Sequence, residues 1–163
     1  MSILIAYATR HGCVKKCAES LAEKLQGKVE LLNLGEKPSV ELAPYDTVII
    51  GGSIYAGNIQ KEVKDFCAQN LEALKGKKLG LFICCMFEKD VAKKQLENAY
   101  PQELLDMAEA KDYFGGELIL GNMGFLEKTV VKMVAKAKKD VSNILEENIN
   151  KFASAINRGG EKV

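Results

Sequence analysis

Apolar and polar residues follow two different periods along this chain, and segments of the two kinds alternate. Short apolar or alternating runs predict strands, because successive side chains of a strand point to opposite faces. The predicted strands are 2–8, 28–34, 46–53, 78–85 and 111–120. Longer segments have apolar residues three and four positions apart, which predicts amphipathic helices. The predicted helices are 14–27, 58–74, 101–110 and 125–157, the last interrupted near Asp140 or Ser142.

Strands that alternate with helices predict a parallel sheet with helices on both faces. The run 28–34 alternates apolar and polar positions, as an outer strand does. Right-handed crossovers leave few possible topologies. We therefore predict an α/β fold, a doubly wound five-stranded parallel sheet in the order 2-1-3-4-5 within three α/β/α layers. Such sheets bind ligands at the carboxyl ends of the strands where the strand order reverses, here beside the first and third strands.

Composition indicates one globular domain over residues 1–163, with 47% hydrophobic and 28% charged residues. A net charge of +1 argues against a nucleic-acid partner, because such proteins are normally clearly basic. No stretch approaches the roughly 18 to 20 consecutive apolar residues of a membrane span. The short apolar run at the start has no basic region before it, unlike a signal peptide. We therefore expect a cytoplasmic protein without an integral membrane segment.

Five cysteines occupy positions 13, 17, 67, 84 and 85. Their number is odd and their spacing matches no zinc pattern, so we expect reduced thiols rather than a disulfide framework or a structural metal. Cys13 lies near a helix start, where the pKa of a thiol can be lowered. A thiol-based redox protein is therefore one alternative function.

The loop after the first strand has the residue types of an anion site. Thr9 offers a hydroxyl, Gly12 can take positive φ, and the helix starting near Cys13 offers unpaired N–H groups. Together they predict a nest for a phosphate, to which Arg10 and His11 could add charge. The alternative is an ordinary strand-to-helix turn capped by Thr9. Neither G-x-x-x-x-G-K-[ST] nor G-x-G-x-x-G is present, which argues against NTP and dinucleotide sites.

The loops after the third and fourth strands could hold a flat aromatic ligand. Tyr55 lies between glycines in "GGSIYAGNIQ" (51–60), where a ring could stack on it while backbone groups of 56–58 bond the ring edge. In "CCMFEKD" (84–90), residues 85–87 could wall the other side. The alternatives are a tight loop with an exposed tyrosine and core thiols at a strand end.

These three loops resemble those of the flavodoxin family, in which a hydroxyl-rich phosphate loop follows the first strand. "TRHGCV" (9–14), "GGSIYAGNIQKEVKDF" (51–66) and "ICCMFEKD" (83–90) align with the three flavin-binding loops. A closer likeness is to the subgroup containing the menaquinone-dependent protoporphyrinogen oxidases, whose second loop reads like G-x-S-I-x-x-G. The resemblance implies a flavodoxin-like fold and FMN as cofactor. The cofactor-binding residues it implies are Thr9, Arg10, His11, Gly12, Cys13, Val14, Ser53, Ile54, Tyr55, Ala56, Gly57, Asn58, Cys85, Met86 and Phe87.

The resemblance further implies an FMN-binding oxidoreductase or electron-transfer protein. Its partners would be a redox protein or a small-molecule or quinone acceptor. The alternatives are a protoporphyrinogen oxidase-type enzyme and an interaction module without FMN. Val14 stands where the family has a closing hydroxyl, and His11 replaces the acid of the subgroup. The net charge of +1 is unlike that of acidic electron carriers. Lys128, Lys132 and Lys136 form a basic stripe, which is either a solvated helix face or a docking surface for an acidic partner, an anionic substrate or a membrane surface.

Overall fold

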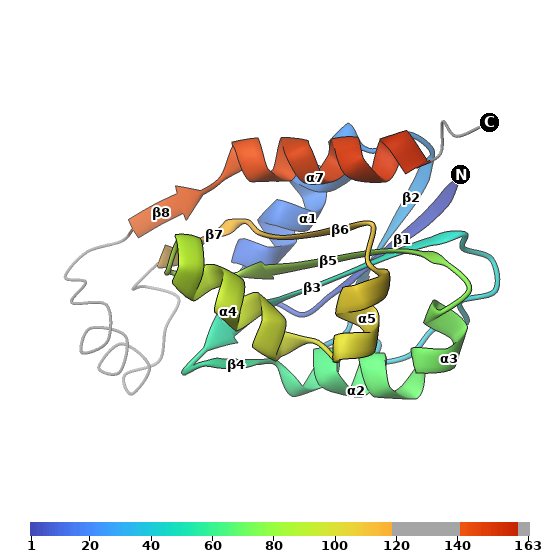
Figure 1. Ribbon diagram of the computed structural model, residues 1–163, viewed down its shortest axis with the longest axis horizontal. Coiled ribbons are helices and arrows are strands. Elements are labelled where there is room, and N and C mark those ends of the chain that lie inside the picture. Colours follow the sequence, from blue (N-terminus) through green and yellow to red (C-terminus); the bar gives the residue numbers. More distant parts are fainter. Residues whose placement is uncertain (119–140, 160–163) are drawn as a thin grey trace.

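The computed structural model describes residues 1–118 and 141–159, and its centre is a parallel sheet (Figure 1). The strands run in the order β2-β1-β3-β5-β6. Their bounds are β1 Ser2–Tyr7, β2 Lys28–Asn33, β3 Thr47–Tyr55, β5 Lys78–Cys84 and β6 Ala110–Tyr113. Strand β1 pairs in parallel with β2 on one side and β3 on the other. The predicted order 2-1-3-4-5 is confirmed, because β5 and β6 are the fourth and fifth strands along this path.

Helices cover both faces of the sheet, which confirms the three predicted layers (Figure 1). One face carries α1 (Cys13–Lys24) and α7 (Glu146–Gly159). The other face carries α2 (Lys61–Gln69), α3 (Leu71–Leu74), α4 (Lys89–Ala99) and α5 (Gln102–Met107). Each face has its own core, and both are built on the same strands.

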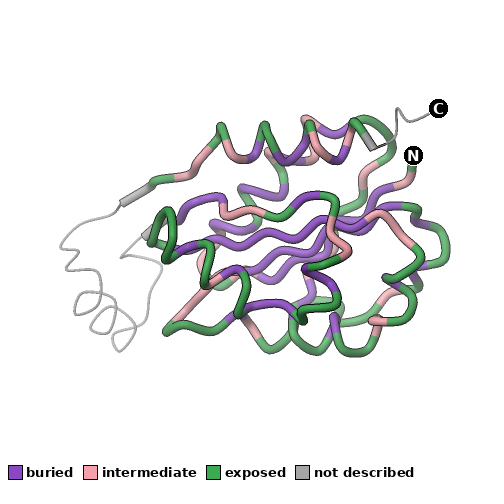
Figure 2. The backbone as a smooth tube through the Cα atoms, in the orientation of Figure 1, coloured by how far each residue is buried: buried purple, intermediate pink, exposed green. Residues whose placement is uncertain are grey.

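The alternation of side chains along β1 creates the two cores. Ile3 and Ile5 pack with α1 and α7, whereas Leu4 and Ala6 pack with the helices of the opposite face. All four are at most 1% exposed. Figure 2 shows that the central strands are buried along their length while the outer surfaces of the helices are exposed. A strand covered on both faces has no polar side, which explains why β1, β3 and β5 are continuous apolar runs.

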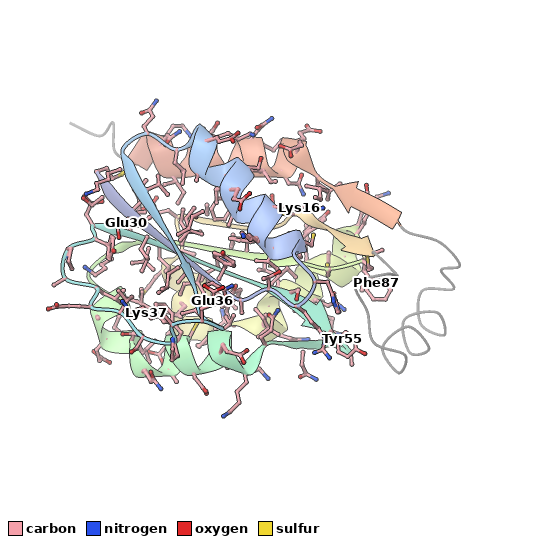
Figure 3. All side chains as sticks on the ribbon, turned by 180° about the vertical axis from the view of Figure 1, so that it is seen from behind. Lys16, Glu30, Glu36, Lys37, Tyr55 and Phe87 are labelled. Carbon is pink, nitrogen blue, oxygen red and sulfur yellow. The ribbon has the colours of Figure 1, made fainter. Side chains whose placement is uncertain are left out.

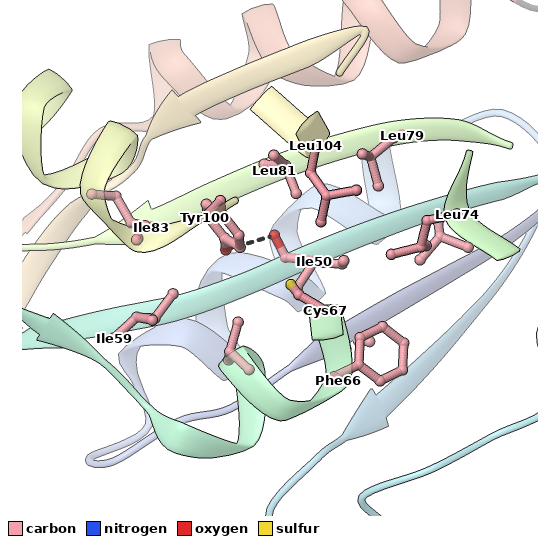
Figure 4. Packing of buried hydrophobic residues seen from close by; sticks show 14 of the residues in the cluster. Ile50, Ile59, Phe66, Cys67, Leu74, Leu79, Leu81, Ile83, Tyr100 and Leu104 are labelled. Carbon is pink, nitrogen blue, oxygen red and sulfur yellow. Dashed lines mark hydrogen bonds between the residues drawn. The ribbon is translucent and has the colours of Figure 1, made fainter. Parts of the chain in front are cut away.

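On the face covered by α2, α3, α4 and α5, the buried Tyr100 forms hydrogen bonds to the sheet (Figure 4). The Tyr100 hydroxyl lies 2.6 Å from the carbonyl oxygen of Phe82 and 3.1 Å from that of Ile50, and donates its hydrogen between them. Around it pack apolar side chains of several elements, including Cys67 of α2 and Leu104 of α5. Burial raises the pKa of Tyr100 well above its usual value, so the hydroxyl remains a donor.

Three phenylalanines fill the α1–α7 face. The rings of Phe82 and Phe114 stack with centroids 4.6 Å apart, and Phe152 of α7 meets Phe114 edge-on at 5.2 Å. The Phe82 ring lies directly over Gly51 of β3, where an added Cβ would come within 2.0 Å of the ring. Glycine is therefore required at position 51 by the close approach of this ring.

The predicted helix 58–74 is wrong at its start. Asn58–Ile59 forms the short strand β4, which pairs antiparallel with the end of β3, and the helix begins only at Lys61. The segment then divides into α2 and α3 around Asn70. Helix α4 was not predicted, because it presents few large apolar side chains: its buried residues are Ala92, Leu96 and Ala99.

The last predicted strand, 111–120, divides after β6. Phe114 still donates to the carbonyl of Ile83, but Gly115 has φ 81°, and β7 (Gly115–Leu118) pairs antiparallel with β8 (Val141–Ile144). Ser142 therefore lies in a strand rather than at a helix break, and α7 begins at Glu146. The predicted helical stripe over 125–140, including Lys128, Lys132 and Lys136, falls outside the described residues.

Replacing Gly51 with alanine should lower the free energy of unfolding by about 1–3 kcal/mol, because the added methyl group overlaps the Phe82 ring. Urea denaturation followed by circular dichroism measures the change. Gly76→Ala is the matched control, since nothing lies within 4 Å of a Cβ built there. Equal stability of the two variants would contradict the close packing of Phe82 on β3.

Candidate functional site

Three loops meet at the carboxyl ends of β1, β3 and β5. The first loop is residues 8–12, between β1 and α1; the second is residues 53–58, from the end of β3 through its turn into β4; the third is residues 85–88, between β5 and α4. Tyr55 of the second loop and Phe87 of the third lie at the same end of the molecule (Figure 3). The structure thus places the predicted site residues at one edge of the sheet.

The first loop is closed by the Thr9 side chain. Its Oγ1 accepts a hydrogen bond from the Gly12 N–H at 2.9 Å, which leaves the hydroxyl hydrogen of Thr9 able to donate elsewhere. Gly12 has φ 94° and open space where a Cβ would project. Helix α1 begins at the next residue, and the N–H groups of a first helical turn have no carbonyl partner within the helix. The loop therefore combines a hydroxyl, helix N–H groups and room for an anion.

The electrostatics of this helix start also favour an anion. The first turn of α1 contains no acidic residue, and Lys15 and Lys16 are exposed there. Arg10 is exposed, whereas His11 is half-buried with its Nε2 atom inside the protein. The positive charges of Arg10, Lys15 and Lys16 add to the partial positive charge at the amino end of the helix.

Two residues of the predicted phosphate loop turn their side chains away from it. Val14 is fully buried, and Cys13 is 8% exposed; both pack in the α1–α7 core. Only their backbone N–H groups are therefore placed to meet a ligand. This placement explains how valine can stand where the flavodoxin pattern has a hydroxyl: at this position the chain needs an apolar side chain for its core.

The second loop is a tight hairpin, a geometry that the sequence did not specify. Tyr55 pairs with Asn58, and the two residues between them, Ala56 and Gly57, both have positive φ, 50° and 81°. Positive φ at both central residues is characteristic of a type I′ turn. Ala56, Gly57 and Asn58 are exposed, and Ser53 and Ile54 are half-buried on the last residues of β3.

Arg10 of the first loop covers the Tyr55 ring of the second. The guanidinium carbon lies 4.1 Å from the ring centroid, within the range of a cation–π contact. The sequence predicted Arg10 beside a phosphate and Tyr55 beside an aromatic ring, but gave no sign that the two side chains touch. A planar ligand that stacks on this face of Tyr55 must take the place of the guanidinium.

The third loop exposes Met86 and Phe87 and buries Cys85. Met86 is 38% exposed and Phe87 43%, while Cys85 is 5% exposed and its thiol donates to the carbonyl of Phe87 at 3.4 Å. Burial raises the pKa of the Cys85 thiol, which keeps it protonated and unreactive. Cys85 therefore stabilises the loop through its buried hydrogen bond to Phe87, and the exposed side chains of Met86 and Phe87 are the ones available to a ligand.

Gln60 joins the first two loops and was missed by the sequence reasoning. Its Nε2 donates to the Ser53 Oγ at 2.6 Å and to the Ala8 carbonyl at 3.2 Å, and its Oε1 accepts from the Ser53 N–H at 2.9 Å. One carboxamide thus ties the end of β1 to the end of β3. Its position just before α2 carries no recognisable motif, so only the three-dimensional arrangement reveals this role.

Asn143 of β8 reaches the third loop in a similar way. Its Nδ2 donates to Glu88 Oε1 at 2.7 Å. The Cys85 N–H donates to the carbonyl of Gly115 at 2.9 Å, so β7 also supports this loop. The sequence analysis placed neither Asn143 nor Gly115 near the site.

In the described part of the chain, no helix has the length and apolar character to cross a membrane.

Comparisons with solved structures return flavodoxins and proteins that contain a domain of this shape. A short-chain flavodoxin associated with a non-canonical PDU bacterial microcompartment has a TM-score of 0.61 at 16% identity, covering 98% of both chains. Flavodoxin 1 from Bacillus cereus has a TM-score of 0.59 at 14% identity, covering 97% of this chain and 98% of that one. These similarities confirm the flavodoxin-like fold.

Larger proteins also match. Rubredoxin oxygen:oxidoreductase from Desulfovibrio gigas has a TM-score of 0.59 at 16% identity; the match covers 99% of this chain but only 37% of that protein.

No curated protein matches the sequence. The family model described as flavodoxin domain matches residues 4–144, which include all three loops. The chain therefore belongs to the flavodoxin domain family.

Proposed function

We propose that this protein binds FMN across the three loops and serves as a flavodoxin-like electron-transfer protein. The observation that carries the proposal is that the first loop, with its Thr9 hydroxyl and open space at Gly12, lies at the same sheet edge as the aromatic side chains of the second and third loops. Family membership supports the cofactor, and one of the structural neighbours is a Fusobacterium nucleatum flavodoxin bound to flavin mononucleotide, with a TM-score of 0.52 at 13% identity, covering 97% of this chain and 96% of that one.

The phosphate group would bind in the first loop. Thr9 would donate its hydroxyl hydrogen, which the Gly12 N–H leaves available by bonding to the oxygen lone pair. The N–H groups at the start of α1, from Cys13 and Val14, would donate as well. Gly12 fits this role because a side chain would project into the open space in front of the loop.

The flavin ring would lie between the second and third loops. Tyr55 offers a ring face once Arg10 moves aside, and Met86 and Phe87 offer exposed apolar surface opposite. The backbone of the exposed turn at Ala56 and Gly57 would meet the ring edge. When bound, FMN supplies the electron-transfer chemistry, while the protein holds the ring, limits its contact with water and sets its hydrogen bonds.

Finer assignments extend the same proposal. The acceptor would be a redox protein or a small-molecule or quinone oxidant, which could reach the ring edge beside the exposed third loop. We place the protein in the cytoplasm, a reducing compartment that suits the five free cysteines. Protoporphyrinogen oxidase-type activity is a narrower alternative, supported by the sequence "GGSIYAG" (51–57) alone.

The phosphate-binding first loop and the ring-binding second and third loops can be tested separately with FMN and riboflavin, because riboflavin lacks the phosphate. We expect FMN to bind at least about tenfold more tightly, as one or more charge-assisted hydrogen bonds would provide. Thr9→Ala should weaken FMN binding by about tenfold and leave riboflavin binding unchanged, whereas Tyr55→Leu should weaken both ligands equally. Flavin fluorescence quenching gives each dissociation constant.

Thr9→Ser, which keeps the hydroxyl, should retain the affinity for FMN. Leu31→Ala is the control: it shortens an exposed side chain of β2, outside the three loops, and should change the affinity for neither flavin. A wild-type protein that quenches neither flavin would overturn the proposal and favour the interaction module without a cofactor.

Gln60→Leu should lower both stability and flavin affinity. The Ser53 N–H and the Ala8 carbonyl would lose their partner at a partly buried site, at a cost of about 1–3 kcal/mol in unfolding free energy. FMN affinity should fall because the first and second loops would no longer be held together. Gln69→Leu on the exposed side of α2 is the control, measured by the same urea titration and fluorescence assay. Identical results for the two variants would show that Gln60 does not join the loops.

A further inference from the structure

Three cysteine sulfurs gather inside the α1–α7 face. The ligand atoms of Cys13, Cys17 and Cys84 all lie within 4.8 Å of one another, and the sulfurs of Cys17 and Cys84 are 3.6 Å apart. In the described part of the chain, this is the one group of three or more cysteine, histidine or acidic side chains close enough to share a metal ion. Electron transfer on FMN does not require any of these thiols.

The fold brings these thiols together for reasons that linear spacing does not show. Cys13 and Cys17 are four residues apart on α1 and so lie on one helix face, above β5. Cys84 is the last residue of β5 and shares the α1–α7 face with Phe82, whereas its neighbour Cys85 belongs to the opposite core. The alternation of the strand therefore selects Cys84, and not Cys85, as the third member.

The cluster is shielded from water. Cys17 is fully buried, and Cys84 and Cys13 are 2% and 8% exposed. Hydrogen bonding with Cys13 is the largest cause of the raised pKa of both Cys17 and Cys84, and burial contributes in each case. The thiols therefore keep their protons until something displaces them.

The sulfur separations, 3.6 Å between Cys17 and Cys84 and at most 4.8 Å within the group, lie in the range that a shared metal ion needs. A cation at the centre of an equilateral triangle with sides of about 4 Å lies roughly 2.3 Å from each corner, which is a metal–thiolate distance. A disulfide would instead require two sulfurs to approach to about 2.05 Å. The 3.6 Å contact of Cys17 and Cys84 would therefore have to close for a disulfide to form.

We propose that Cys13, Cys17 and Cys84 form a three-coordinate thiolate site for Cu(I). Soft thiolate ligands select this ion, whereas zinc almost always takes four ligands and the group contains three. On binding, three S–H bonds break, three Cu–S bonds form and three protons pass to the buffer, without any change of oxidation state. The resulting site carries net negative charge, which the positive amino end of α1 beside Cys13 partly offsets.

The test is an anaerobic titration of the reduced full-length chain against a Cu(I) complex of the coloured chelator bicinchoninate. We expect the chain to remove one Cu(I) from the chelator, seen as loss of its colour. Cys84→Ala should weaken binding by at least tenfold. Cys67→Ala is the matched control, because Cys67 is equally buried, at 1% exposed, but lies in the opposite core. Unchanged competition by Cys84→Ala, or none by the wild type, would overturn the proposal.

X-ray absorption on the Cu(I)-loaded wild type provides a second measurement that does not depend on the folding of a variant. Three sulfur neighbours at one distance are the expected result, and two or four sulfurs would contradict the assignment. Circular dichroism of Cys84→Ala and Cys67→Ala checks that both fold. Displacement of the bound Cu(I) by an equal concentration of Zn(II) would also overturn the choice of ion. None of these readouts involves flavin, so the result stands apart from the FMN titrations.

Discussion

The parallel hydrogen bonding of β1 with a strand on either side is the constraint on which the site depends. After β1 the chain forms β2 on one side of β1, and it then returns to form β3 on the other side, parallel to β1. The first and second loops therefore begin next to each other at the same sheet edge and diverge from there. The Ala8 N–H donates to the Gly51 carbonyl at 3.1 Å, and the Gln60 side chain bonds both the Ala8 carbonyl and Ser53, which joins the two loops just beyond the strands.

Much of this fold could be predicted because its strands have an unusually clear pattern. Leu4 and Ile5 point to opposite cores, so both positions must be apolar, and a continuous apolar run results. The errors fall where the pattern is weak. Helix α4 is held by Ala92, Leu96 and Ala99, whose small side chains give little periodic signal. Strand β4 is only Asn58–Ile59, and its turn uses Ala56 at a positive φ where asparagine is the usual indicator.

The residues of the candidate site could be predicted more readily than their contacts. Thr9 and Phe87 follow strand ends and Tyr55 is the last residue of β3, and the topology alone brings strand ends together. The Gln60 bonds, the contact of Arg10 with Tyr55 and the meeting of Cys84 with Cys17 join residues many positions apart. Such contacts depend on the register of particular strands and the rotation of particular helices. A single sequence contains no local signal for either.

The position of Arg10 couples the two halves of the site. A cation–π contact at an exposed position is worth about 0.5–1 kcal/mol, whereas a hydrogen bond to a charged group contributes about 1.5–3 kcal/mol. A phosphate in the first loop would therefore draw the guanidinium away from Tyr55 and uncover the ring face. Riboflavin lacks the phosphate and would have to displace Arg10 without that compensation. A contact of Arg10 with the phosphate would thus offset the cost of uncovering the Tyr55 ring, an advantage of FMN over riboflavin that adds to the bonds from Thr9 and the helix N–H groups.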